Sequence, residues 1–269
     1  MAGPIGSSQW SYSSGGDSSV YDHQITQSAR FDRGTYSHLT LGATDTSGNR
    51  NYWTFSVWFK RIEIDERHHI LGAYSGNGYS DDVLRIQITD ANYPATGTGN
   101  RFQVNSNETN MGFTNDADKT IKDTSSWYHL VWSNNNGACI VYINGESWTT
   151  FNLDGGTNSA MNSKQMKIGI DAATSTGDGF DGYMAEAIMI SHGTSGGGTL
   201  TPTSFGESKN GIWIPKDVST LSNKDFHLDF ANASALGNDV SGNDRDWTVN
   251  NMGTDHQVLD SPTNGTGGD

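Results

Sequence analysis

The stretch RIEIDERHHI, residues 61–70, contains residues whose types and spacing could do chemistry. Glu63 and Asp65 are two residues apart, and on a β-strand such residues point to the same face. Two carboxyl groups on one face can hydrolyse a glycosidic bond, one as an acid and the other as a nucleophile or base. His68 and His69 follow directly. The first question is whether this segment is the active site of a polysaccharide hydrolase.

The next position in the same alternation is Arg67, whose guanidinium stays protonated at neutral pH and cannot act as a general acid. Glu66 would point to the opposite face if the strand continued. We therefore interpret the segment as a solvated connection, with His68 and His69 entering the next strand. Adjacent residues of a strand face apart, so the two histidines make a poor metal pair. We expect no catalytic residues here and no enzymatic activity.

A second candidate is a calcium site in the segment NDVSGNDRDW. Its tight, glycine-containing loop carries four oxygen-bearing side chains: Asp239, Asn243, Asp244 and Asp246. The segment GDGFDG adds Asp178 and Asp181. Ca²⁺ takes six to eight oxygen ligands, which one loop rarely supplies. The alternative, which we favour, is a set of Asx-turns, in which these side chains bond their own backbone.

Carbohydrate binding would need aromatic faces beside polar groups at loop tips. The segment GAYSGNGYSDD reads as a long loop with such a mixture, and Trp148 follows the YINGE hairpin. The candidate glycan-binding residues are therefore Tyr74, Tyr79, Asp81, Asp82 and Trp148. Single aromatic residues are also common on ordinary protein surfaces, so the alternative for each candidate is a surface residue without a binding role.

The net charge of the 269-residue chain limits the kinds of partner that it can bind. Sixteen basic and 30 acidic residues give 16 − 30 = −14, which disfavours a nucleic-acid partner. No apolar run reaches the length of a membrane span, and the N-terminus lacks the pattern of a signal peptide, so we expect synthesis in a cytoplasm and no membrane contact. The single cysteine, Cys139, lies in the apolar run ACIVYIN and is expected to be a buried, inert thiol.

The elements that would position these residues are short strands. Period-two alternation recurs along the chain, and 33 glycines against 5 prolines suit many tight turns. In YWTFSVWFK, one face is expected to be buried: Trp53, Phe55, Val57 and Phe59. In VLRIQIT, Arg85 and Gln87 face away from the apolar positions. The pattern predicts a β-sandwich over residues 28–215, an N-terminal arm at 1–27 and a C-terminal extension, 216–269, packed on or beside the sandwich.

Four blocks resemble the laminin-G-like jelly rolls of the concanavalin A-like lectin/glucanase superfamily: SARFDRGTYSHLTLG, YWTFSVWFKR, SSWYHLVWSNNNGACIVYINGE and FDGYMAEAIMISHG. The resemblance implies an all-β, concanavalin A-like jelly-roll β-sandwich of two antiparallel sheets, and a packing role for His129 in WYHLVW. Glucanases of that superfamily carry three carboxylates on alternate residues of one strand. Arg67 stands where the third would be needed.

The long C-terminal block, from LTPTSFGESKNGIWIP to DRDWTVNN and then VLDSPTN, is similar to one branch of that superfamily. This branch is found in structural proteins of tailed bacteriophages, especially marine ones, and the similarity covers roughly residues 28 to 264. It implies a non-enzymatic virion protein on the particle exterior: a head decoration, knob or fibre, or a tail-fibre component. Binding to host-surface polysaccharide would be a second function. The alternatives are a β-glucan hydrolase and a free carbohydrate-binding lectin.

The expected partners are other capsid or tail proteins and further copies of the chain, with a trimer favoured on resemblance alone. Residues 1–27 are too polar to form a core, yet they contain Trp10, Tyr12 and Tyr21 among serines and glycines. Such a segment can become ordered by laying its aromatic rings on a partner. We therefore expect an assembly arm that a neighbour orders, and not the chain's own sandwich.

Overall fold

The structure is a computed structural model that describes residues 21–42, 52–74, 84–91, 99–106, 109–113, 119–153, 165–173, 176–192 and 200–263. In chain order the strands are β1 (Ser28–Phe31), β2 (His38–Leu41), β3 (Tyr52–Arg61), β4 (His68–Tyr74), β5 (Leu84–Ile88), β6 (Phe102–Ser106), β7 (Thr109–Phe113), β8 (Tyr128–Asn135), β9 (Ala138–Ile143), β10 (Glu146–Asn152), β11 (Gln165–Ile168), β12 (Gly182–Ser191), β13 (Gly206–Lys209), β14 (Ile212–Pro215), β15 (Lys224–Leu228), β16 (Thr248–Asn250) and β17 (Gln257–Val258). Short 3-10 helices are η1 (Arg33–Thr35), η3 (Pro202–Ser204) and η4 (Thr254–His256).

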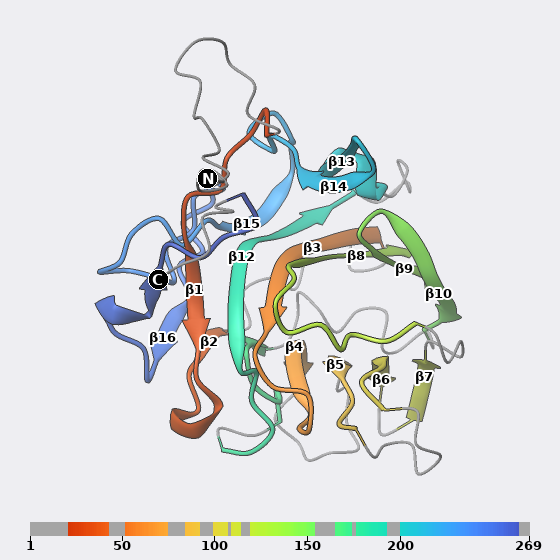
Figure 1. The fold of residues 1–269 in the computed structure, drawn as a ribbon, viewed down its shortest axis with the longest axis horizontal. Coiled ribbons are helices and arrows are strands. Elements are labelled where there is room, and N and C mark those ends of the chain that lie inside the picture. Colours follow the sequence, from red (N-terminus) through yellow and green to blue (C-terminus); the bar gives the residue numbers. More distant parts are fainter. Residues whose placement is uncertain are drawn as a thin grey trace, which may run out of the picture.

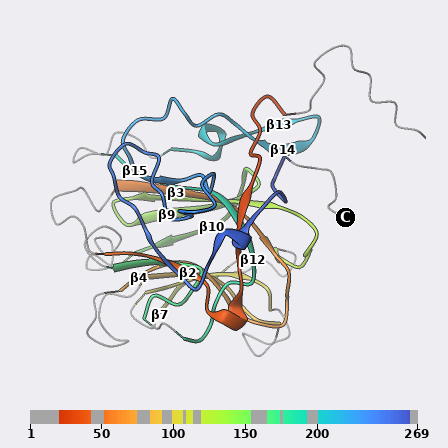
Figure 2. The same ribbon diagram turned by 90° about the vertical axis from the view of Figure 1, so that its left-hand side faces the viewer.

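Two antiparallel sheets face each other, as Figures 1 and 2 show. One has eight strands, in the order β10-β9-β8-β3-β12-β1-β17 with β15 also paired to β12. The other has seven, in the order β16-β2-β11-β4-β5-β6-β7. The predicted all-β jelly-roll sandwich is confirmed. None of the helices in the part of the chain that the structure describes is long and apolar enough to span a membrane.

The main core lies between the two sheets and follows the predicted alternation of β3. Trp53, Phe55, Val57 and Phe59 are all inaccessible to solvent and belong to one hydrophobic cluster. The rings of Trp53 and Trp132 meet edge to face at 4.8 Å between centroids, a favourable aromatic geometry. The predicted burial of this strand face is therefore confirmed.

A third layer covers the outer face of the eight-stranded sheet. The hairpin β13–β14 and helix η3 lie above that sheet in both ribbon views (Figures 1 and 2). Phe205 and Val218 of this layer pack on Val131, Ile188 and Ile190 of the sheet in a second, smaller hydrophobic cluster. This third layer buries the face of β3 and β8 that would be exposed to solvent in a two-layer sandwich.

The C-terminal segment is built into both sheets. Strand β15 pairs with β12, β17 pairs with β1, and β16 pairs with β2 of the opposite sheet. Strands of the segment expected to pack on or beside the sandwich thus complete its edges. The division into arm, sandwich and extension at residues 27 and 215 itself stays a prediction.

The last seven residues of the predicted arm, 21–27, lie on the chain's own sandwich. Ile25 is 4% exposed and packs in a cluster with Trp58 and Ala185. Its backbone N–H donates to Thr263 Oγ1 at 2.9 Å, and the hydroxyls of Ser261 and Thr263 donate to its carbonyl oxygen. Ile25 is thus ordered by the chain's own sandwich, which differs from the expectation of an arm that only a partner orders. The assembly role of Tyr21 stays a prediction. Trp10 and Tyr12 lie outside the described residues.

Candidate functional site

The carboxylates of the segment RIEIDER do not lie on a sheet face. Strand β3 ends at Arg61 and β4 begins at His68, so Glu63 and Asp65 belong to the connection between them. Arg61 is fully buried and holds this connection from inside. Its guanidinium donates to the carbonyl oxygens of Glu63 and Glu66 and also bonds Asn100 Oδ1 at 2.9 Å. Burial lowers the pKa of Arg61 to about 10. The predicted inter-strand connection is confirmed.

The two histidines after the connection face opposite sides of β4, as predicted. His68 faces the core, where its ring meets Phe180 edge to face at 5.4 Å and its Nδ1 accepts the Asp181 N–H at 3.1 Å. His69 lies on the other face, with Nε2 3.9 Å from Asp178 Oδ2. Burial lowers the pKa of His68 to about 2 and also lowers the pKa of His69, so both rings are neutral at physiological pH.

Arg67 forms ion pairs with carboxylates that would otherwise be candidates for a role in hydrolysis. It lies 3.4 Å from Asp178 Oδ2 and 4.0 Å from Asp90 Oδ2. Arg33 bonds Glu66 at 2.7 Å and lies 3.8 Å from Asp178. These pairings build an ion-pair network around the connection. The carboxylates of Glu66 and Asp178 are therefore engaged by guanidinium groups of the protein itself.

The outer face of the seven-stranded sheet carries buried polar side chains. On β5, Arg85 and Gln87 alternate with core residues, as predicted, yet they are only 7% and 2% exposed. Arg85 Nε donates to Asp171 Oδ1 at 2.8 Å, and Gln87 Nε2 donates to Gln103 Oε1 at 2.5 Å. Burial alone would raise the pKa of Asp171, but His69 and Arg85 lower it below its ordinary value. Asp171 is therefore a structural anion, whereas a glycosidase acid needs a raised pKa.

The loop NDVSGNDRDW is closed by its own hydrogen bonds. Asp239 Oδ1 accepts the N–H groups of His227 and Ser241, and Oδ2 accepts the Ser241 hydroxyl and the Arg245 N–H, all between 2.7 and 3.0 Å. Asp246 accepts the Asp239 N–H at 2.8 Å. Asp239 and Asp246 therefore bond backbone N–H groups, as the favoured interpretation of this loop predicted.

The other calcium candidates do not complete a ligand set. Asn243 donates through its amide to the carbonyl oxygens of Lys224 and Asp225, and Asp244 is exposed at φ 53°. Asp178 is held among arginines, and burial followed by the nearby Asp32 carboxylate raises the pKa of Asp181. Among the residues that the structure describes, no group of three or more His, Cys, Asp or Glu side chains could hold a metal ion.

The glycan-binding candidates are not brought together as one described surface. Tyr74 is the last residue of β4, whereas Trp148 in β10 is partly buried against the main core. Lys119 Nζ donates to the Trp148 carbonyl oxygen at 3.2 Å. Tyr79, Asp81 and Asp82 lie outside the described residues. Their role in glycan binding stays a prediction.

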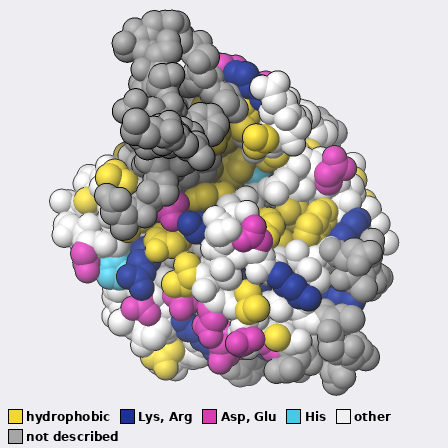
Figure 3. All heavy atoms as spheres, viewed as in Figure 1, with side chains coloured by type: hydrophobic (Ala, Val, Ile, Leu, Met, Phe, Trp, Pro, Cys, Tyr) yellow, Lys and Arg dark blue, Asp and Glu magenta, His cyan; other side chains and the backbone are white. Residues whose placement is uncertain are grey.

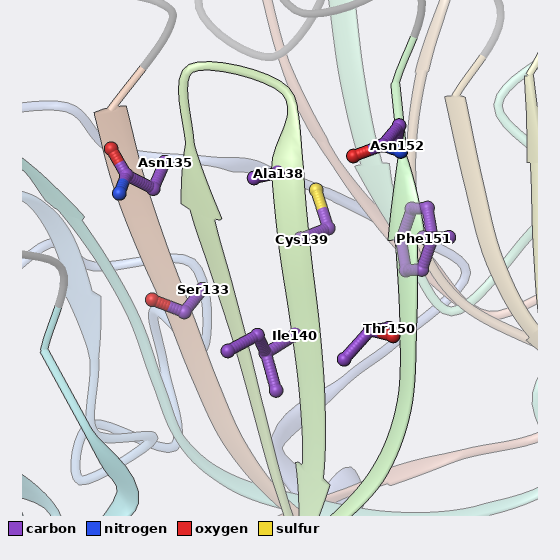
Figure 4. A pocket seen from close by; sticks show the side chains of 8 residues that line it. All are labelled: Ser133, Asn135, Ala138, Cys139, Ile140, Thr150, Phe151 and Asn152. Carbon is purple, nitrogen blue, oxygen red and sulfur yellow. The ribbon is translucent and has the colours of Figure 1, made fainter.

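A hollow of about 390 Å³ lies at the β8–β9–β10 end of the eight-stranded sheet (Figure 4). Ser133, Ile140 and Thr150 are in register across its three strands, with Asn135, Ala138 and Asn152 in register beyond them. Cys139, also in its lining, is 2% exposed, and burial raises the pKa of its thiol to about 12. The predicted buried core thiol is confirmed, and none of the described side chains that line the hollow is ionised at neutral pH.

A second hollow, of about 520 Å³, is lined by two tryptophans that sequence reasoning did not select, Trp127 and Trp213. Trp213 comes from β14 and donates its indole N–H to His129 Nδ1 at 3.0 Å. His129 is stacked on Trp58 at 4.5 Å between centroids and is bonded to Ser56 through Nε2 at 2.8 Å. The predicted packing role of His129 is confirmed, and its partner is the third layer.

The second tryptophan is held from the other side of the hollow. Trp127 Nε1 donates to Asp260 Oδ1 at 3.0 Å, and Lys60 Nζ donates to the other oxygen of the same carboxylate at 2.7 Å. Trp127 precedes β8 and Trp213 lies in β14, so the sequence offers no spacing that would link them. The only signals were the runs SSWYHLVWS and GIWIP, which we interpreted as strands alone.

A family model described as the concanavalin A-like lectin/glucanases superfamily matches residues 32–192, more than half of the chain. The chain belongs to this superfamily. The structure agrees with this membership: two antiparallel sheets form a sandwich, and the WYHLVW strand is packed within it. No curated protein is similar enough in sequence to count as a match.

Solved structures share the fold at low sequence identity. A candidate carbohydrate-binding protein from Bacteroides ovatus has a TM-score of 0.56 and 17% identity, over 85% of this chain and 59% of that one. The heptameric SAP-like pentraxin from Limulus polyphemus has a TM-score of 0.44 and 14% identity, over 64% and 80%. Tailspike protein 2 from Escherichia coli O157:H7 bacteriophage CAB120 has a TM-score of 0.47 and 14% identity, over 72% and 27%. The likeness to the Bacteroides ovatus structure shows a shared fold, in agreement with the family match.

Proposed function

We propose that this chain is a non-enzymatic structural protein on the exterior of a tailed-phage particle, where it also binds host-surface glycans. The observation that carries the proposal is the place of the phage-like C-terminal block in the fold. This block supplies β13–β16, which cover the outer face of one sheet and extend both sheets. Its similarity to phage structural proteins therefore concerns the body of the domain and not a detachable tail.

The charge arrangement supports a non-enzymatic role. Glu63 and Asp65 are in a connection pinned by Arg61, and Asp171 is paired with Arg85. Retaining and inverting glycosidases both need a protonated carboxyl group facing a second carboxylate across the scissile bond. The described outer face of the seven-stranded sheet carries ion pairs and an amide pair instead.

The surface supports display in many crowded copies. In Figure 3, acidic and basic side chains are interspersed over the lower half of the visible face, with separate hydrophobic side chains among them. A net charge of −14 keeps neighbouring copies soluble, because like-charged surfaces repel.

Activity is tested by incubating the pure protein with laminarin, agar and alginate and measuring reducing ends. We expect no turnover, and turnover that a Glu63→Gln substitution removes would contradict the non-enzymatic role. Location is tested by immunogold electron microscopy of intact phage particles that encode the chain. Label on the head or tail surface is expected, and particles without label would contradict the virion role.

A further inference from the structure

We propose that the hollow between Trp127 and Trp213 is a binding site for a neutral saccharide. We call it the indole groove and define it by Trp127, Trp213, Ile212, Asn144, Glu146 and Ser208. The inference deepens the glycan-binding part of the proposed function and rests on it. The groove lies outside all the residues that the sequence nominated.

Both indole rings are fixed before any ligand arrives. The N–H donors of both are used inside the protein, on Asp260 for Trp127 and on His129 for Trp213. Trp213 also sits against two glycines, since a Cβ atom at Gly145 or Gly206 would lie only 2.6 or 2.7 Å from its ring. Fixed rings lose little entropy on binding, so the groove is preorganised.

With their N–H groups engaged, the rings offer carbon surface. The face of an aromatic ring carries negative charge density, which attracts the weakly positive C–H groups on one side of a pyranose ring. Ile212, 56% exposed in β14, extends this apolar surface at the groove. A volume of about 520 Å³ falls within the range of small-ligand sites.

The remaining lining residues supply hydrogen-bonding groups of both kinds. Asn144 and Gly145 have φ of 50° and 85°, which forms the tight turn between β9 and β10. Asn144 Oδ1 accepts the His129 N–H at 2.7 Å, which leaves the amide N–H groups as donors towards a ligand. Glu146 and Ser208 are exposed and supply acceptors. Sugar hydroxyls both donate and accept, so they need this mixture.

Charge selects a neutral sugar. Among the described residues that line this groove, Glu146 is the one charged side chain, and none is a Lys or an Arg. Sialic and uronic acids would meet a carboxylate without a compensating cation, on a chain of net charge −14. The opposite alternative is a quaternary ammonium group, which favours aromatic rings beside a carboxylate. Glu146→Gln separates these ligands, because it keeps an acceptor oxygen and removes the charge.

The test uses the full chain on an array of neutral and acidic oligosaccharides, followed by titration calorimetry with the neutral oligosaccharide that is retained best. Ile212→Asp places a charge at the groove from an exposed position, and Val240→Asp is its matched control, since Val240 is 43% exposed in the Asp239 loop. We expect Ile212→Asp to weaken binding at least about tenfold with an unchanged melting temperature. Val240→Asp should bind as the unmodified chain does, and Glu146→Gln should stay within about threefold of it.

Several results would overturn the inference: no neutral oligosaccharide retained, unchanged binding by Ile212→Asp, or a loss of all binding in Glu146→Gln. A change in oligomeric state in Ile212→Asp without any effect on glycan binding would make the groove a protein contact and would also overturn it. Immunogold labelling of the particle is independent of these measurements. Particle label without saccharide binding refutes this inference alone, and saccharide binding without particle label refutes the virion role alone.

Discussion

At the scale of single residues, His129 links the sandwich to the third layer. Trp213 Nε1–H can only donate, so His129 Nδ1 accepts it and the ring proton is on Nε2, which donates to Ser56 Oγ. The ring is completely buried, and this burial lowers the pKa of His129 from 6.5 to about 3. The contacts around His129 therefore suit the neutral imidazole, which has one acceptor and one donor nitrogen.

This burial predicts an acid sensitivity. The unfolded chain binds a proton at His129 below about pH 6.5 while the folded chain does not, so stability falls as the pH falls from 6.5 towards 3. Chemical denaturation between pH 7 and 4.5 should show this loss. In His129→Phe, the slope should be smaller by up to about 1.4 kcal/mol per pH unit. An unchanged slope would mean that His129 is protonated in the folded protein.

Asp239 carries a second prediction at this scale. Its carboxylate accepts from three donors of its own loop and from the His227 N–H of β15. Asp239→Asn should therefore cost about 2 kcal/mol of unfolding free energy, because an amide nitrogen would face donors. The exposed Asp244, where φ is 53° and Asn is also well tolerated, is the matched control, and Asp244→Asn should be nearly neutral. Because the Asp239 and Asp246 carboxylates already accept hydrogen bonds from the protein, EDTA should leave the melting temperature unchanged. A fall with EDTA, abolished in Asp239→Asn, would restore the calcium site.

At the scale of elements, β3 is buried on both faces for different reasons. Its odd-numbered residues face the main core, whereas Thr54, Ser56 and Trp58 face the third layer and are at most 4% exposed. Polar residues are tolerated there because they are bonded: Thr54 Oγ1 to His192 at 2.9 Å and Ser56 Oγ to His129. Although β3 is buried on both faces, one face is mainly apolar and the other also carries hydrogen-bonded polar side chains.

This asymmetry predicts unequal effects along β3. Phe55→Ala should cost roughly 3–5 kcal/mol, as large aromatic truncations in cores do. Ser56→Ala, the neighbouring control on the opposite face, should cost about 1 kcal/mol for its hydrogen bond. Urea denaturation measures both. Similar costs for the two variants would contradict the assignment of Phe55 to the core face of β3 and of Ser56 to its outer face.

At the scale of the whole molecule, we expect two parts of the N-terminal segment to have different roles, residues 21–27 in folding and residues 1–20 in assembly. Residues 21–27 are tied to the sandwich through Ile25, and Lys209 binds Asp22 at 2.9 Å. We therefore expect removal of residues 1–20 to preserve the melting temperature but to convert an oligomer, with a trimer favoured, into monomers in sedimentation velocity. Removal of residues 1–27 should in addition destabilise the fold, because the contacts of buried Ile25 are lost.

The two truncations serve as controls for each other. A truncation at residue 20 that unfolds the protein would place the whole segment in the domain core. One that leaves the oligomer intact would refute the assembly arm. Only a loss of assembly with retained stability agrees with the proposal that a partner orders the first 20 residues.

Short-range patterns in the sequence were enough to establish several features of the protein. Alternation in YWTFSVWFK and VLRIQIT indicated which side chains face the core, since successive residues of a strand point to opposite faces. Arg67, in the place of a third carboxylate, is the reason for our prediction that Glu63 and Asp65 do not act in hydrolysis. Burial of Cys139 was likewise predicted from its apolar run, whereas the packing of His129 was implied by the resemblance of WYHLVW to the laminin-G-like jelly rolls.

Contacts between residues distant in the chain came from the tertiary structure alone. Trp127 and Trp213 form one groove only because hairpin β13–β14 folds over the sheet, a long-range packing event that no local spacing records. The buried guanidinium of Arg61 likewise donates to Asn100 and Ile121, which are 39 and 60 residues away in the chain. Ile25 became part of the domain because residues 261 and 263 return to it. Local periodicity specifies faces, whereas the pairing of faces is set by which surfaces can be buried together.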